Sequence, residues 1–303
     1  TLEADRRQRQ MCIRDRTDTG GILARLPRKV ISALLLLMLT GCSGTTFVYN
    51  RLDFLIPWYV GKYVDLTRLQ KQLLDEQLDP FLKWHRYDEL PAYLQILDQI
   101  EATLDDGVRA DQIASIVAEI EAAGLRIERS GLEWMLVLGE DLTDKQMAAF
   151  IASLREKQEE YEEEYLSRDD EEFHEEAYEN LKDSLQDYMG RLDWGQRGIL
   201  EESAAGLQRS DAAWLRERAA WLDRLEGILQ REEGWQQAMR DSLANRENTT
   251  SPEYLAIYEH NAAVIFEALA KVLSSRTEQQ DGRLRRELGS LREDLETLIA
   301  KKT

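Results

Sequence analysis

The chain has 303 residues, and its 58 acidic residues outnumber the 39 Lys and Arg, which gives a formal net charge of −19. This acidic balance argues against nucleic-acid binding, because such binding depends on basic patches that neutralise phosphates. It equally disfavours broad contact with anionic lipid head groups. Only five prolines are present, and long segments repeat their apolar residues with the 3.6-residue period of a helix. We therefore predict an all-α fold, an elongated multi-helix bundle with long antiparallel helices and no sheet.

Residues 1–16 show no hydrophobic periodicity. The string Met11-Cys12-Ile13-Arg14-Asp15-Arg16 resembles translated read-through of a sequencing adapter. We expect this segment to be an artefact or disordered, and it takes no part in the predicted fold.

Residues 17–41 have the order of a secretory signal peptide. Arg25, Arg28 and Lys29 precede a short apolar run, which is followed by the small residues Thr40 and Gly41. The run is shorter than the roughly 20 apolar residues that span a bilayer. A buried core helix is the alternative, but it explains neither the basic flank nor the abrupt return to polar sequence.

The string Leu39-Thr40-Gly41-Cys42 resembles the lipobox of bacterial lipoproteins. The resemblance implies that the Cys42 thiol receives diacylglycerol and that Cys42 becomes the first residue of the mature protein. Two or more acyl chains would hold it stably on a membrane. Because Ser43 rather than an aspartate follows, the resemblance further implies an outer-membrane lipoprotein that faces the periplasm.

Cleavage before Cys42 would leave a still more acidic protein. Residues 1–41 contain 8 basic and 4 acidic residues, so residues 42–303 keep 39 − 8 = 31 basic and 58 − 4 = 54 acidic ones, a formal charge of −23. Cys42 would be the only cysteine left, which excludes a disulfide and a cysteine metal site. Cationic partners, divalent ions and simple solubility all remain open as reasons for the charge.

Residues 42–66 are expected to form a lipid-anchored, aromatic-rich N-terminal segment, followed by a helical bundle domain over 67–303. Two interpretations of the aromatic side chains stay open: an interfacial belt at the membrane surface, or a short helix with its rings in the core. The rings belong to Phe47, Tyr49, Phe54, Trp58, Tyr59 and Tyr63.

The first long helix is predicted to begin at 65–67, with a kink at Asp79-Pro80 and a break at Glu89-Leu90-Pro91. A second helix should end at Gly107. The string from Trp84 to Tyr93 between them resembles a family of proteobacterial lipoproteins named only as a domain of unknown function. That resemblance implies an all-helical periplasmic lipoprotein and no known activity.

This string also holds the candidate functional cluster. Arg86 and Glu89 are spaced for an i,i+3 ion pair, and His85 and Glu89 for an i,i+4 contact. A catalytic dyad would need a nucleophile or a metal, and neither is visible, so we interpret Arg86 and Glu89 as a clamp at the bend. The cluster comprises Trp84, His85, Arg86, Glu89 and Tyr93.

Three strings have the form of a helix capping box: 66–70, 142–146 and 192–196. In each, Thr or Asp caps the first free amides and a glutamine three residues later reaches back. The Leu-Thr-x-x-Gln form is similar to a motif of Spy/CpxP-like periplasmic chaperones, but capping alone explains it.

The remaining helices are predicted over 111–138, 147–190, 210–245 and 252–298. Gly124 and Gly131 are interpreted as a tight packing site, and the final leucines as a coiled-coil-like heptad seam that packs on the same bundle. The acidic run 156–179 is a solvated face, a docking face for a basic partner, or a weak ion site. Glu171-x-x-His174 has di-iron spacing, but without a second such motif we predict no metal.

The sequence therefore predicts a non-enzymatic envelope lipoprotein that serves as a binding or scaffolding module, with a chaperone-like holdase as the alternative. An enzyme that uses His85, Arg86 and Glu89 is a third hypothesis and requires a polar pocket there. We predict no cofactor, no metal and no catalytic residue. The expected partners are the membrane, through the N-terminal lipid, and a protein of the envelope, but not nucleic acid.

Overall fold

A computed structural model describes residues 44–301 of the chain. Within this range every regular element is a helix and no strand is present, which confirms the predicted all-α class. The segments 1–16 and 17–41 and the predicted lipid-attachment residue Cys42 lie outside the described residues. The elements are α3 (Gly44–Tyr49), α4 (Leu52–Val60), α5 (Arg68–Trp84), the π-helical turn η2 (His85–Glu89), α6 (Leu90–Asp106), α7 (Ala110–Asp141), α8 (Asp144–Leu166), α9 (Asp170–Met189), α10 (Trp194–Ala205), α11 (Asp211–Ile228), α12 (Trp235–Ala244), α13 (Arg246–Thr249), α14 (Pro252–Ser274) and α15 (Glu278–Ala300).

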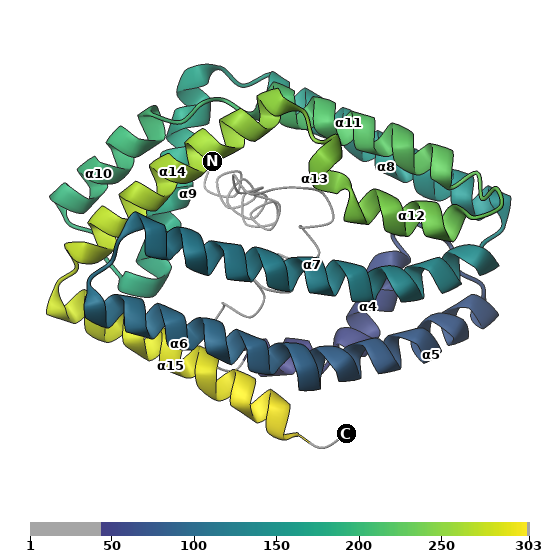
Figure 1. Cartoon of the computed structure of the whole chain (residues 1–303), viewed down its shortest axis with the longest axis horizontal. Helices are drawn as coiled ribbons and strands as arrows, with labels where there is room; N and C mark the ends of the chain where they lie inside the picture. Colours follow the sequence, from purple (N-terminus) through teal and green to yellow (C-terminus); the bar gives the residue numbers. More distant parts are fainter. Residues whose placement is uncertain (1–43, 302–303) are drawn as a thin grey trace, which may run out of the picture.

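The helices form a flattened frame (Figure 1). Along one long edge α5 and α6 follow each other, with α15 beside α6 and the antiparallel α7 packed on both. Helices α8 and α11 pair at the opposite edge, and α9, α10 and α14 form one end of the frame. Helix α14 also contacts α7, the long helix in the middle of the frame (Figure 1). Helix α15 then packs against α6 at the long edge.

Two hydrophobic cores are joined by the longest helix. Ile127 of α7 belongs to a core built mainly with α6, α14 and α15, whereas Leu132 and Leu136 belong to a core built with α5, α8 and α11. Phe81 and Leu82, in the last turn of α5, pack against both cores. The π-helical turn therefore lies where the two cores meet.

The predicted break at Glu89-Leu90-Pro91 is wrong, because α5, η2 and α6 follow one another without an intervening loop. Proline lacks an N–H, and its ring crowds the carbonyl four residues earlier in a regular helix. A π turn inserts one extra residue and relieves that crowding. Pro91 accordingly lies in the first turn of α6, and Pro80 lies inside α5.

Three stretches that we predicted as single helices are each divided in two. The first divides before α9, where Asp169 forms a capping box with Glu172, and the last divides before α15, where Thr277 forms one with Gln280. The stretch 210–245 divides between α11 and α12, where Arg231 and Gly234 adopt positive φ angles of 59° and 87°. Periodicity alone missed these ends because apolar residues keep their spacing across each cap.

Other predicted details are confirmed. Helix α6 ends before Gly107, which has a φ of 88°, and Ser251 caps α14 with Pro252 as its first residue. The leucine seam of α15 packs into the core it shares with α6 and α9, as expected for packing on the same bundle.

Close backbone packing occurs at Gly139 rather than at Gly131. A Cβ on Gly139 would lie 3.1 Å from Cη2 of Trp235, which is tighter than ordinary contact, whereas one on Gly131 would lie 3.9 Å from Phe81 Cε2. The tight packing predicted at Gly131 is therefore wrong. The close approach on α7 is made by α12, through the Trp235 ring.

All three predicted capping boxes are formed, at Thr67, Thr143 and Asp193. A further Thr-x-x-Gln box, at Thr277, follows an arginine, so the leucine-based pattern did not include it. In each box the cap side chain accepts the backbone N–H of the glutamine, and the glutamine amide oxygen accepts the N–H of the cap residue.

The four boxes at Thr67, Thr143, Asp193 and Thr277 pair with one another across the fold. The Gln70 and Gln146 amides bond reciprocally at 3.1 and 2.8 Å, and those of Gln196 and Gln280 at 3.0 and 2.8 Å. Gln70 also donates to the Asp141 carbonyl oxygen at 2.9 Å, and Gln280 to that of Arg191 at 3.0 Å. We call these pairs the glutamine clamps. One ties the start of α5 to that of α8, and the other ties α10 to α15.

Candidate functional site

The π-helical turn η2 places three polar side chains of the predicted cluster inside the protein. His85, Arg86 and Glu89 are all buried, with exposed fractions of 3%, 9% and 4%. Polar groups at such depth require partners, because an unpaired one costs about 1–3 kcal/mol. π turns often occur at functional sites. The hydrogen-bond partners of these three side chains therefore indicate whether this turn has a catalytic or a structural role.

His85 lies between two tyrosines. Its Nδ1 is 2.9 Å from the Tyr49 hydroxyl of α3, and its Nε2 is 3.2 Å from the Tyr93 hydroxyl of α6. Burial, and next the positive charge of Arg86, lowers the pKa of His85 to about 4, and burial raises the pKa of Tyr49 to about 12. The ring is therefore neutral at pH 7, with one nitrogen donating and the other accepting.

Arg86 turns toward the N-terminal segment rather than toward Glu89. Its Nη2 donates to Asn50 Oδ1 at 3.3 Å, and its Cζ lies 5.2 Å from the centroid of the Tyr49 ring. Among the described residues Nη1 has no hydrogen-bond partner, and the cation–π contact offsets part of that cost. Tyr87, the next residue, donates from its hydroxyl to the Lys301 carbonyl oxygen at 3.0 Å, just beyond α15.

Glu89 pairs with α7. Arg126 Nε and Nη2 donate to the two carboxylate oxygens of Glu89 at 2.7 and 2.9 Å, and this hydrogen bonding raises the pKa of Arg126. The predicted Arg86–Glu89 pair and the His85–Glu89 contact are therefore both wrong. In the wider π turn these side chains face different neighbours, so consecutive polar residues tie η2 to α3, α6, α7 and the end of α15.

The other two residues of the predicted cluster lie at its edge. Tyr93 is buried and holds His85, as described. Trp84 is half-buried, with its ring 5.9 Å from Phe81 and 6.3 Å from His85 between centroids. The structure thus brings together four of the five predicted residues around His85, whereas Glu89 faces Arg126.

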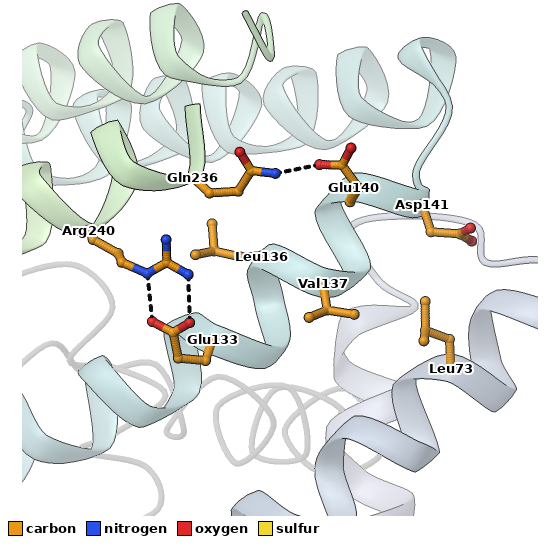
Figure 2. Close-up of a pocket in the computed structure, with 8 residues that line it drawn as sticks. All are labelled: Leu73, Glu133, Leu136, Val137, Glu140, Asp141, Gln236 and Arg240. Carbon is orange, nitrogen blue, oxygen red and sulfur yellow. Dashed lines mark hydrogen bonds and ion pairs between the residues drawn. The ribbon is translucent and has the colours of Figure 1, made fainter. Parts of the chain in front are cut away.

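A shallow pocket of about 430 Å³ lies between α5, α7 and α12, away from η2 (Figure 2). Its apolar lining comes from Leu73, Leu136 and Val137. Along one side, two carboxylates of α7 bond to α12: Glu133 to Arg240 at 2.8 and 2.9 Å, and Glu140 to Gln236 at 2.6 Å.

The pocket carries a net negative charge. Three acidic residues, including Asp141, and one arginine line it, so two negative charges are left over. Its chemistry suits a small apolar group flanked by a basic one. Sequence periodicity did not find this pocket, since its α12 wall belongs to a stretch predicted as one helix with α11.

The sequence profile of one family, described as a family of unknown function, DUF6279, matches residues 62–255. The chain belongs to this family. No curated protein and no solved structure matches the chain. The DUF6279 match includes η2, the pocket and the capping boxes at Thr67, Thr143 and Asp193, whereas α3 and α4 up to Val60 precede it.

The remaining histidines of this DUF6279 chain bond to backbone carbonyls. His174 Nε2 lies 3.1 Å from the Leu207 oxygen, and His260 Nε2 lies 3.0 Å from that of Gly206. In the part of the chain that the structure describes, no group of three or more His, Cys, Asp or Glu side chains is placed to hold a metal ion. The Glu171-x-x-His174 spacing thus corresponds to a helix contact with the loop after α10.

Low pH should destabilise the protein through His85. Its pKa is about 4 in the folded state and about 6.5 when unfolded. Its stabilising contribution is complete above pH 6.5 and is lost as the pH falls toward 4. Between pH 7 and 5, urea unfolding should show a loss of about 2 kcal/mol that His85→Gln abolishes. His260→Gln, at an exposed position, serves as control; identical pH profiles for wild type and His85→Gln would contradict this assignment.

Proposed function

We propose that this DUF6279 protein is a lipid-anchored envelope protein that faces the periplasm, and that its helical body is a non-enzymatic binding or scaffolding module. The observation that supports the non-enzymatic role best is the engagement of the polar cluster. Both ring nitrogens of His85 and both carboxylate oxygens of Glu89 bond to side chains of other elements. A catalytic group needs a free position toward substrate, and these groups instead hold α3, α6 and α7 together.

The pocket beside α12 supports a binding role. It combines apolar lining with a local excess of carboxylates, and the predicted mature chain has a formal charge of −23. Such a surface attracts basic partners and repels acidic ones. A basic segment of an envelope protein with one apolar side chain for the pocket is the partner chemistry that this surface favours.

The anchoring part of the proposal is supported by the position of the lipobox. Cys42 stands only two residues before Gly44, where α3 begins, so acyl chains on Cys42 would reach the helical body without a long linker. None of the helices within 44–301 is long and apolar enough to cross a bilayer.

Labelling with radioactive palmitate tests the anchor. Wild type should incorporate label, and Cys42→Ala should lose it, because only the thiol at the lipobox accepts diacylglycerol. Cys12→Ala is the matched control, since it removes the only other cysteine and should leave the labelling unchanged. Equal labelling of wild type and Cys42→Ala would refute the proposed anchoring.

A holdase remains the second candidate, favoured by apolar side chains in the capping boxes. Trp194 and Leu69, which lie inside two of the capping-box strings, have exposed fractions of 84% and 75%. Such residues offer contacts to an unfolded client. An aggregation assay with a chemically unfolded client separates the two candidates: a scaffold should leave aggregation unchanged at an equimolar ratio, whereas a holdase should suppress it.

A further inference from the structure

One face of the α3–α4 segment presents aromatic and cationic side chains to solvent. Phe47, Phe54 and Trp58 have exposed fractions of 62%, 64% and 55%, and Arg51 and Lys62 are exposed between and after them. Phe54 and Trp58 lie four residues apart on α4 and therefore on the same side of that helix. Phe47 lies on α3, and Arg51 and Lys62 flank the two ends of α4. We call this set the aromatic–cation stripe.

The opposite face of the segment belongs to the protein interior. Tyr49 and Leu52 are buried in the first core, Ile56 packs against both cores, and Val60 packs against the second. The segment is therefore fixed to the body through one face. This packing keeps the stripe turned outward, so its exposure does not depend on a detached or partly folded helix.

The cations of the stripe lie on its rings. Lys62 Nζ is 4.1 Å from the centroid of the Trp58 ring, and Arg51 Cζ is 5.2 Å from that of Phe47. Residues 44–64 contain two basic residues and one acidic residue, Asp53, for a local charge of +1. This segment thus departs from the acidic character of the chain, and its charge suits the anionic head groups of a bilayer.

We propose that the aromatic–cation stripe lies in the interfacial zone of the bilayer, with its rings at the head-group boundary and its cations toward lipid phosphates. Aromatic side chains favour this zone, and binding there increases with buried apolar area and attraction to anionic lipid. The proposal rests on the proposed lipid anchor, because Cys42 precedes Phe47 by only five residues. The acyl chains and the stripe would then enter the same patch of membrane.

This contact would also orient the body. In Figure 1, α4 is seen between α5 and α7 and lies farther from the viewer than either. A protein held by acyl chains alone can rotate about its tether, whereas a second contact through α3 and α4 fixes one side toward the membrane. The pocket beside α12 would then keep a constant orientation relative to the bilayer.

Quenching of tryptophan fluorescence by brominated lipid tests the stripe. The full-length acylated protein is reconstituted into vesicles of three parts phosphatidylcholine with brominated acyl chains and one part phosphatidylglycerol. One of the seven tryptophans should be quenched, so bromination should remove about one-seventh of the emission if the tryptophans emit equally. Trp58→Ser should abolish this quenching. Trp194→Ser, which removes an exposed tryptophan of α10, should leave it unchanged.

Palmitate incorporation, measured on the same samples, separates this proposal from the anchor. Label without Trp58-dependent quenching overturns the stripe and leaves the anchor standing. Trp58-dependent quenching of a wild-type chain that incorporates no label supports the stripe and refutes the anchor. Self-association of Cys42→Ala that is abolished by Trp58→Ser, with no quenching, would assign the face to a second copy and overturn the proposal. Circular dichroism of each variant establishes that the helices are retained.

Discussion

Replacing Gln196 with alanine is expected to lower the free energy of unfolding by about 3 kcal/mol, the largest single effect that we predict. Gln196 is only 1% exposed. Its amide oxygen accepts the N–H of Asp193, and the amide bonds reciprocally with Gln280. The substitution removes the glutamine half of the capping box of α10 and leaves the buried Gln280 amide without its partner across the fold.

The matched control is Gln112→Ala. Gln112 also closes back on its cap residue, accepting the Arg109 N–H at 3.1 Å, but this bond is exposed and no second glutamine faces it. Its loss should cost less than about 1 kcal/mol. Urea unfolding followed by circular dichroism measures both variants. Equal destabilisation by the two would mean that the glutamine clamp adds nothing beyond ordinary helix capping.

Replacing Arg126 with leucine should cost about 2 to 3 kcal/mol. The change leaves the buried Glu89 carboxylate without its counter-charge. In a fully buried ion pair, removing one partner costs about 3–5 kcal/mol. Arg126 itself is 39% exposed, so water would reach part of the vacated position and reduce the penalty. The double variant Arg126→Leu/Glu89→Leu should recover part of the loss, because it removes the unpaired charge as well.

The Arg240–Glu133 pair provides the control, since its two hydrogen bonds have the same bidentate form but both side chains are exposed. Arg240→Leu should leave the urea midpoint unchanged within error, because exposed ion pairs contribute little to stability. If Arg126→Leu were as harmless as Arg240→Leu, then η2 would not be tied to α7 through Glu89, and the scaffold interpretation of the cluster would fail.

Capping motifs predicted three helix starts correctly, whereas apolar periodicity missed three helix ends and no local signal predicted the contacts between helices. The capping boxes at Thr67, Thr143 and Asp193 follow from the residue types within each string, because capping uses neighbours along the chain. The reciprocal bonding of Gln70 with Gln146 joins residues 76 positions apart. No local pattern encodes such a pairing, so it emerged only from the three-dimensional arrangement.

The candidate site likewise has a part that the local sequence predicted and contacts that it did not. The burial of His85, Arg86 and Glu89 around one turn corresponds to the cluster predicted from the string 84–93. The predicted ion pair within the string failed because regular i,i+3 geometry does not hold in a π turn. The observed partners, Tyr49 and Arg126, come from helices on either side in the sequence and are marked by no motif of their own.

The aromatic-rich segment had two open interpretations; the structure assigns Tyr49 to the core, and the membrane contact of the exposed rings stays a proposal. Tyr49 belongs to the core, whereas Phe47, Phe54 and Trp58 face solvent. Aromatic composition alone could not assign the rings to one side or the other. The assignment depends on which face of α3 and α4 meets the bundle, and that is decided by packing on α5 and α15.

The central claim, that the mature protein begins at an acylated Cys42 and presents its helical body from a membrane, is tested most directly by mass spectrometry. The protein is extracted from envelopes with detergent, and its N-terminal peptide is sequenced. We predict a peptide that begins at Cys42 and bears a thioether-linked diacylglycerol. An N-terminus upstream of Cys42, or an unmodified Cys42 thiol in the isolated protein, would contradict this account.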